Sequence, residues 1–243
     1  MSSTKGKKQS PAVVIMRREL GAYFTSPIAY IVTGLFLIIA GILFFATFFL
    51  QNRAELRNYF SLLPVLLSFF IPALTMRIFA EEKRSGSLET LMTLPVTETD
   101  VVTGKWLAAF ISTAAMIAPT LLYILPVVIF GTPDAGPIFG GFLGALFLCA
   151  AFSAIGVFAS SITKNQIIAF FTAFIICIVL TMIDQFLVFL PAQVVSVLSY
   201  ISASAHFTSV SRGIIDTRDL LYFVSITVFF FYLTVVTQQN ERR

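Results

Sequence analysis

The stretch from Phe79 to Trp106 reads "FAEEKRSGSLETLMTLPVTETDVVTGKW" and interrupts a chain that is otherwise strongly apolar. Long runs of Ile, Leu, Val, Phe and Ala lie on both sides of it. Of the 243 residues, 58% are hydrophobic and only 12% are charged, whereas an ordinary soluble domain carries about 25% charged residues. A large buried core does not explain that difference. The composition therefore predicts an integral membrane protein with one organised polar segment.

The apolar runs are long enough to form membrane-spanning helices, because roughly 20 apolar residues cross a hydrocarbon core of about 30 Å. The sequence lacks the alternating segments of about ten residues that are typical of outer-membrane barrels. We therefore expect an all-α integral membrane protein, with a disordered basic tail over residues 1–10 and a single transmembrane domain over residues 11–243. The six expected spans are Ile28–Leu50, Phe60–Ile78, Leu107–Phe130, Ile138–Ser161, Ile167–Ile183 and Leu220–Thr237.

Basic residues predict the orientation of these spans. With six spans, both termini lie on the same side of the membrane. That side would carry Lys5, Lys7, Lys8, Arg17, Arg18, Arg77, Lys83, Arg84, Lys105, Lys164, Arg242 and Arg243. The other side would carry only Arg53, Arg57, Arg212 and Arg218. The positive-inside rule then predicts cytoplasmic termini in a bacterial cytoplasmic membrane. This bias accounts for the net charge of +4, so no nucleic-acid partner is expected.

The segment before the first span has a helical pattern. Val13, Met16, Leu20 and Phe24 recur at helical spacing, and proline at the start of this segment is tolerated in a first helical turn. We expect an amphipathic interface helix over residues 11–25 that rests on the cytoplasmic membrane surface and contacts lipid. The alternative is an ordinary flank that only anchors the first span.

The opening stretch contains a short helix between two breaks. Ser85–Ser87 interrupts the helix that leaves the second span, and Ser87 can cap a new helix that begins at Leu88. Leu91 and Met92 share a face with Leu88. A helix of about seven residues is unstable in isolation, and the charged residues around it disfavour deep contact with lipid. We therefore expect it to pack on another protein; the alternative is packing only on its own bundle.

A second signal begins the third span. Pro95 ends the short helix, because the residue before a proline is displaced from helical geometry. Thr97 and Asp100 then form a capping-box-like pair that starts the next helix. Residues 80–105 are therefore expected to be a cytoplasmic coupling segment.

Polar residues within the spans allow more than one interpretation. Ser61, Ser68 and Thr75 are seven residues apart and share a helix face. That face could line a conduit, although such hydroxyls more often bond to neighbouring helices. Cys149 and Cys177 lie inside apolar runs and are expected to be small buried hydrophobes.

The region from residue 184 to residue 217 is too polar for a span and too apolar for a solvated loop. We expect short re-entrant helices that dip into the outer leaflet and are covered by protein. Asp184 and His206 lie in this region, and no role is predicted for either of them. His206 is the only histidine.

Two stretches carry a resemblance to a known family. "YFTSPIAYIVTGLFL" (residues 23–37) and "PALTMRIFAEEKRSGSLETLMTLPVTETDVVTGKW" (residues 72–106) resemble the permease subunit of ABC-2 type transporters. The gliding-motility GldF-type permeases are the most similar branch, and accessory permeases of nitrous-oxide reductase are relatives. The resemblance implies a dimer of two permease copies above two separate cytoplasmic ATPase subunits. It also implies that the N-terminal helix and the loop between the second and third spans are interface and coupling helices.

The resemblance also implies roles for individual residues. The family pattern E-x-x-x-G-[ST]-x-E corresponds here to Glu82 through Glu89. The implied coupling residues are Glu82, Arg84, Gly86, Ser87, Leu88, Glu89, Leu91, Met92, Leu94 and Pro95. Among these, Glu82, Arg84 and Glu89 would fix the segment and its ATPase contacts, and the apolar side chains Leu88, Leu91, Met92 and Leu94 would fill a cleft in the ATPase. The implied interface-helix residues are Arg17, Arg18, Glu19 and Leu20.

These patterns predict a transporter subunit that depends on another chain for energy. No G-x-x-x-x-G-K-[ST] phosphate-binding loop occurs in the sequence. We expect no catalytic residue, metal or cofactor in this chain, with ATP and Mg bound by the partner ATPase. The work would be export, or mechanical action on an extracytoplasmic partner such as a GldG-like accessory protein with a large outer domain.

Two alternatives belong to other functional classes. An ion-coupled secondary transporter usually places carboxylates at the membrane midplane, and the interiors of the expected spans contain none. An intramembrane enzyme needs a cluster of acids, bases or metal ligands, and His206 has no second ligand candidate in the sequence.

Overall fold

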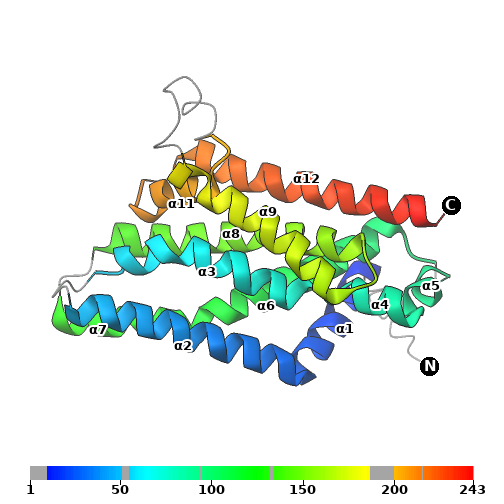
Figure 1. Ribbon diagram of the computed structural model, residues 1–243, viewed down its shortest axis with the longest axis horizontal. Coiled ribbons are helices and arrows are strands. Elements are labelled where there is room, and N and C mark those ends of the chain that lie inside the picture. The colour runs from blue at the N-terminus through cyan, green and yellow to red at the C-terminus, as the bar shows by residue number, and fades with distance from the viewer. Residues whose placement is uncertain are drawn as a thin grey trace, which may run out of the picture.

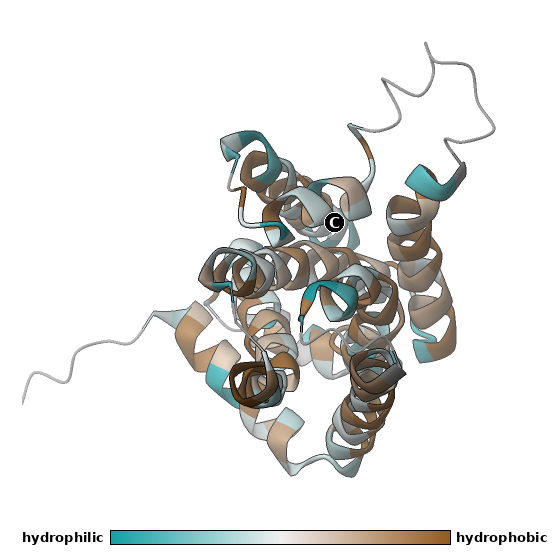
Figure 2. Ribbon diagram, turned by 90° about the vertical axis from the view of Figure 1, so that its left-hand side faces the viewer, coloured by the Kyte–Doolittle hydropathy of each residue, from teal (hydrophilic) through white to brown (hydrophobic). Residues whose placement is uncertain are grey.

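The computed structural model describes residues 10–50, 55–93, 95–131, 134–186, 200–214 and 216–242. Within these ranges the regular structure is helical, and the long helices lie side by side (Figure 1). Six segments among the described residues are long and apolar enough to cross a membrane. They are Pro27–Phe49, Arg57–Ser85, Glu98–Phe130, Ala135–Ser161, Gln166–Gln185 and Thr217–Glu241. The all-α fold and the six spans are thus confirmed, and apolar residues predominate along these helices (Figure 2).

Helix α8 (Ala135–Ser161) lies at the centre of the bundle and contacts α3 (Arg57–Thr75), α9 (Gln166–Phe186) and α12 (Thr217–Glu241). Its glycines allow this close packing. A Cβ atom on Gly141 would lie 2.3 Å from the ring of Phe60, and one on Gly156 would lie 2.0 Å from Thr75 Oγ1. Small residues at such contacts let helices approach each other without a hydrophobic driving force.

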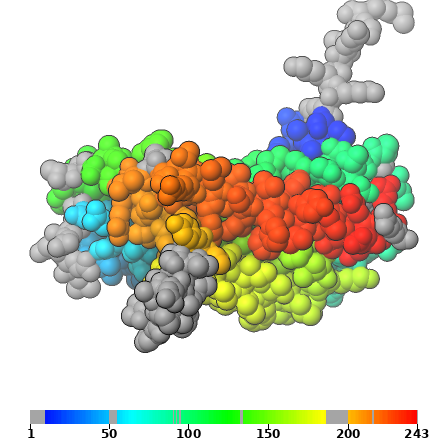
Figure 3. Space-filling model, turned by 90° about the horizontal axis from the view of Figure 1, so that it is seen from above, coloured from blue at the N-terminus to red at the C-terminus, as the bar shows by residue number. Residues whose placement is uncertain are grey.

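The periphery of the bundle is apolar. Helix α2 (Pro27–Leu50) exposes Ile31, Ile38 and Phe49, and α9 exposes Ile175. Helix α12 extends along most of the molecule (Figure 3). Cys149 and Cys177 are fully buried and form no disulfide, as expected for small buried hydrophobes.

The third span is irregular in its outer half. Helix α6 (Glu98–Ile117) continues as the 3-10 helix η1 (Ala118–Tyr123) and then as α7 (Ile124–Phe130). Proline at position 119 removes a backbone donor there. Tyr123 stacks on Phe44 with ring centroids 4.8 Å apart and donates a hydrogen bond of 3.3 Å to the carbonyl of Leu37. A 3-10 stretch within a helix often marks a hinge.

Helix α1 (Pro11–Thr25) has the bounds expected for the interface helix. It packs on α6, where a Cβ atom on Gly104 would lie only 2.7 Å from the carbonyl oxygen of Ala12. Ala12 and Ile15 are the buried apolar residues of this contact. Val13, Met16 and Leu20 of the predicted stripe are half-buried beside this contact, whereas Phe24 is exposed.

The outer region is partly described. Helix α11 (Ala203–Ser211) is a short helix that packs on α8, α3 and α9, so protein covers it as expected. It is followed by Gly213, whose φ of 85° favours glycine. The short helices were expected within residues 184–217, of which residues 187–199 lie outside the described residues, as do residues 1–9 of the expected basic tail.

Candidate coupling site

The expected break between the second span and the short cytoplasmic helix lies at Gly86. Helix α4 (Ala80–Ser85) ends there, Gly86 has a left-handed φ of 75°, and α5 (Ser87–Met92) follows. A left-handed residue after a helix is usually glycine, because a Cβ atom is disfavoured in that conformation. Ser87 is the first residue of α5 and not its cap, which corrects the expected start by one residue. Its hydroxyl bonds to that of Ser85 at 2.9 Å.

The turn between α3 and α4 is held by a side chain from α8. Ser160 is fully buried, and its hydroxyl accepts hydrogen bonds of 3.0 Å from the backbone amides of Phe79 and Ala80. It donates a bond of 2.8 Å to the carbonyl of Met76. Because unpaired backbone groups are costly to bury, this one serine stabilises the exit from the second span.

Lys105 on α6 is the centre of a buried charge cluster. Its side chain is 0% exposed, and its Nζ atom lies 3.0 Å from Glu19 Oε1 and 2.8 Å from Glu82 Oε2. Nζ also donates a bond of 2.8 Å to the carbonyl of Ile78 and lies 4.9 Å from the ring centroid of Phe79. A lysine is almost never fully buried unless it is paired, and here its two carboxylates come from α1 and α4.

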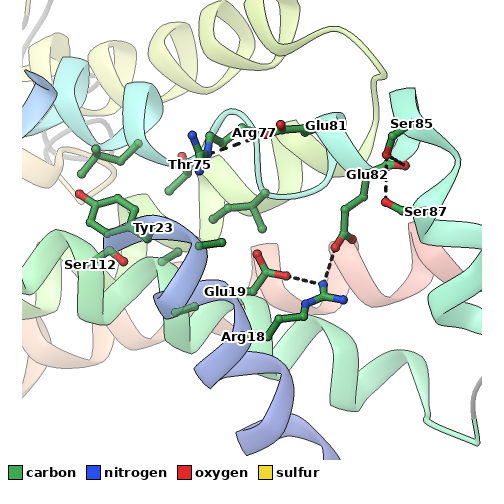
Figure 4. A pocket seen from close by; sticks show the side chains of 15 residues that line it. Arg18, Glu19, Tyr23, Thr75, Arg77, Glu81, Glu82, Ser85, Ser87 and Ser112 are labelled. Atoms are coloured by element: carbon green, nitrogen blue, oxygen red, sulfur yellow. Dashed lines mark hydrogen bonds and ion pairs between the residues drawn. The ribbon is translucent and has the colours of Figure 1, made fainter. Parts of the chain in front are cut away.

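Arg18 completes the cluster. Its Nη2 atom donates to Glu19 at 2.6 Å and to Glu82 at 2.5 Å (Figure 4). Two cations and two carboxylates thus join α1, α4 and α6 with no net charge. We call these four residues, Arg18, Glu19, Glu82 and Lys105, the charge cluster.

The neighbouring positive charges keep the Glu19 carboxylate ionised. Burial alone would raise the pKa of Glu19, but the Lys105 charge and the hydrogen bonds from Arg18 and Lys105 outweigh it and hold this pKa below its ordinary value. Burial alone would lower the pKa of Arg18, and the two carboxylates raise it instead. Near neutral pH, Glu19 and Arg18 are therefore both charged.

A cavity of about 430 Å³ lies beside the charge cluster, between α1, α3, α4 and α6. Tyr23, Thr75, Arg77 and Ser112 line its inner part (Figure 4). Arg77 also donates a hydrogen bond of 2.8 Å to the hydroxyl of Ser26, at the junction of α1 and α2.

A second set of ion pairs ties α12 to the same end of the bundle. Lys83 on α4 is nearly buried, donates to the carbonyl of Ser161 and pairs with Glu241. Arg242 pairs with Glu98 at 2.5 Å. Helix α4 is therefore held from one side by α1 and α6 and from the other side by α8 and α12.

The apolar face of α5 packs on the chain's own bundle. Leu88 and Leu91 are each only 7% exposed and lie in a cluster with Ile15, Phe79 and Val101. For these two residues, burial agrees with the alternative of packing on the bundle, because the cytoplasmic ends of α1 and α6 provide an apolar surface within this chain. The implied role of filling an ATPase cleft stays a prediction.

The remaining coupling residues lie outside that core. Arg84, Glu89 and Pro95 are exposed. Leu94 and the side chain of Met92 lie outside what the structure describes. Thr97 and Asp100 form the expected capping box, with the Asp100 amide donating to Thr97 Oγ1 at 3.1 Å.

On the interface helix, Arg17 is exposed and Leu20 is half-buried, whereas Arg18 and Glu19 enter the charge cluster. The hydroxyls of Ser61, Ser68 and Thr75 each bond to a carbonyl three or four residues earlier in their own helix. The hydrogen bonds described for them therefore do not reach neighbouring helices. Thr75 lines the cavity, and a conduit along this face stays a prediction.

Sequence reasoning did not find Lys105, Lys83 or Ser160 as site residues. A signal for Lys105 was present, because Val101, Ala108 and Ser112 place a small and apolar stripe around it on α6, and all three are buried. Such a stripe predicts that a lysine within it faces the bundle.

His206 also has a partner that the sequence did not reveal. Its Nδ1 atom lies 2.6 Å from Asp219 Oδ1, and its Nε2 atom lies 3.1 Å from the carbonyl oxygen of Tyr200. Among the described residues, no group of three or more His, Cys, Asp or Glu side chains could hold a metal ion.

The fold and the charged end define a multi-pass α-helical membrane protein in which ion pairs and hydrogen bonds connect the segment between the second and third spans to the bundle. The sequence matches the family of ABC-2 family transporter proteins over residues 13–238. The chain belongs to this family, and it is therefore a membrane-embedded permease component of an ABC transporter in the bacterial cytoplasmic membrane. No curated protein matches the chain.

Proposed function

We propose that the chain couples ATP hydrolysis by a separate cytoplasmic ATPase to export, or to mechanical work on an extracytoplasmic partner. The observation that carries this proposal is the attachment of α4 to four other helices. Through Glu82, Lys83 and the turn at Phe79, this short exposed segment is joined to α1, α6, α8 and α12. A force applied to α4 and α5 is therefore passed directly into the spans.

The contact with the ATPase is assigned to the exposed side of this segment. Arg84 and Glu89 project from α4 and α5, whereas Leu88 and Leu91 are buried. Charged side chains at the edge of an interface control partner choice and association rate. Two ATPase copies would bind ATP and Mg beneath two permease copies, and the exposed apolar faces of α2 and α9 are available for the second permease copy.

The GldF-type assignment is part of the same proposal. The E-x-x-x-G-[ST]-x-E pattern at residues 82–89 and the absence of a large outer segment between the spans support a permease that works with a separate GldG-like accessory protein. In that case the complex would contribute to gliding motility.

The test is purification of the chain at its native expression level, followed by identification of the proteins that accompany it. We expect an ABC ATPase, and charge reversal by Glu89→Arg should weaken its retention. Arg57→Glu, an exposed charge reversal at the opposite end of the bundle, is the matched control and should retain the ATPase. If wild-type protein retains no ATPase, the proposal is wrong. If Glu89→Arg retains as much as the control, the assigned contact is wrong.

A further inference from the structure

We infer that Lys105 is a positioning residue for energy transfer, because it makes α1, α4 and the cytoplasmic part of α6 move as one unit. This inference rests on the proposed function and names the part of the chain that receives the motion of the ATPase. It places that part at the interface helix and the third span.

The burial of Lys105 is the first step. Its ammonium group is fully removed from solvent; it donates hydrogen bonds to Glu19 of α1 and to the carbonyl of Ile78, and it forms an ion pair with Glu82 of α4. A buried charge that loses a partner keeps its desolvation penalty without compensation. A displacement of α4 that left α1 or α6 behind would therefore be strongly unfavourable.

Arg18 adds a direct link between α1 and α4. It donates to the carboxylates of both Glu19 and Glu82, so each acid is shared by two cations. The four charges cancel, and loss of either carboxylate would leave the fully buried Lys105 with only one acidic partner.

The contact between α1 and α6 does not depend on these charges. Gly104 precedes Lys105, and a Cβ atom there would lie 2.8 Å from Ile15 Cβ. Backbone packing thus already joins α1 to α6, and Lys105 and Arg18 add α4 to this pair. The charge cluster is the connection between the segment that meets the ATPase and a preassembled pair of helices.

The ends of this moving unit are visible in the fold. Helix α1 ends and α2 begins at Ser26, whose hydroxyl accepts a hydrogen bond from Arg77. Helix α6 gives way to the 3-10 helix η1 at Ala118. Motion of α4 would therefore tilt α6 about η1, which lies beside α2 through Tyr123 and Leu37.

The experiment separates binding of the ATPase from its stimulation. Lys105→Met should lower permease-stimulated ATP hydrolysis about tenfold, within the usual range of coupling free energies between sites. It should retain the ATPase, because the exposed side of α5 is unchanged. Arg57→Met, which removes an exposed cation at the opposite end of the bundle, is the matched control and should behave as wild type.

A double variant distinguishes loss of coupling from loss of folding. Lys105→Met with Glu82→Met replaces the pair by apolar groups and leaves the Arg18–Glu19 pair neutral, so thermal stability should return toward wild type. Stimulation should stay low, because α4 is no longer joined to α6 by charge.

The outcomes are distinct. Full stimulation in the stable double variant would overturn the role of Lys105 while leaving the proposed function intact. Loss of the ATPase from Lys105→Met together with its return in the double variant, at full stimulation, would show a structural role only. A wild-type complex without any ATPase would overturn both the inference and the proposed function.

Discussion

The cytoplasmic and outer ends of the bundle are held together in different ways. At the cytoplasmic end, ion pairs connect α1, α4, α6 and α12, and Lys105 is buried among them. At the outer end the main contacts are aromatic, such as Phe44 on Tyr123 and Phe60 against Phe142. Removal of one partner from a buried ion pair leaves an uncompensated charge, whereas aromatic contacts depend on the fit of the rings and on buried apolar area. The charged connections therefore lie at the end of the bundle that carries the proposed coupling segment.

One polar contact at the outer end makes the comparison sharper. His206 lies between the Asp219 carboxylate and the Tyr200 carbonyl, and its ring stacks on Tyr222 with centroids 4.2 Å apart. Among the described residues, this His206–Asp219 contact is the polar side-chain link between α11 and α12, whereas several ion pairs connect helices at the cytoplasmic end.

The largest effect is expected from overpacking the outer half of α8. Gly141→Ala places a methyl group 2.3 Å from the ring of Phe60, which is fully buried. We expect a loss of about 3 kcal/mol of stability, the upper part of the usual range for overpacked cores. Thermal unfolding in detergent micelles measures it. Gly34→Ala is the matched control, because a Cβ atom there meets nothing within 4 Å; equal stability of the two variants would contradict packing as the main force at this end.

The charge cluster should give the next largest effect, and it should depend on pH. Glu19→Gln is expected to cost about 2 kcal/mol near neutral pH, as for a hydrogen bond to a charged group. The pKa of Glu19 is lowered in the folded chain, so its stabilisation is complete above the ordinary carboxylate pKa and is lost as pH falls through the folded value. The difference between wild type and Glu19→Gln should therefore shrink in acid. The exposed Glu55→Gln serves as control and should show no such dependence.

The outer His206–Asp219 contact should matter less than the cluster. His206→Ala removes one hydrogen bond and leaves Asp219 buried, with an expected loss of about 1.5 kcal/mol. Ser209 lies on the same helix and lines a small cavity together with His206 and Asp219, and Ser209→Ala should be neutral. A loss in His206→Ala as large as in Glu19→Gln would mean that the two ends are not as different as the contacts indicate.

The smallest effect is expected from the exposed pair at the end of α12. Arg242 is half exposed, and its bond to Glu98 resembles surface pairs that contribute about 0–1 kcal/mol. Arg242→Gln should leave the unfolding temperature nearly unchanged at moderate salt. A marked shift that disappears at high salt would show that α12 is held to α6 more firmly than this geometry implies.

Local signals were sufficient for much of the architecture. The six spans follow from apolar runs, and the bounds of α1 follow from helical spacing after Pro11, because both signals lie within a few residues of the structure they describe. The same holds for the capping box at Thr97. The break before α5 was predicted to within one residue, because Gly86 has a positive φ that glycine adopts more easily than other residues.

Such local signals do not reveal which charged residues pair with one another in the fold. Lys105 meets Glu19 across 86 positions of the chain, and Lys83 meets Glu241 across 158 positions. The apolar face of α5 was visible in the sequence, yet whether it met a partner or its own bundle depended on what surface lay opposite. The sequence alone determined that this protein is a six-span helical membrane protein with a short polar cytoplasmic segment, because the length of an apolar run and the position of a helix break are local properties. The connection of that segment to α1, α6, α8 and α12 was decided only by the tertiary structure, because buried ion pairs need partners that folding brings together.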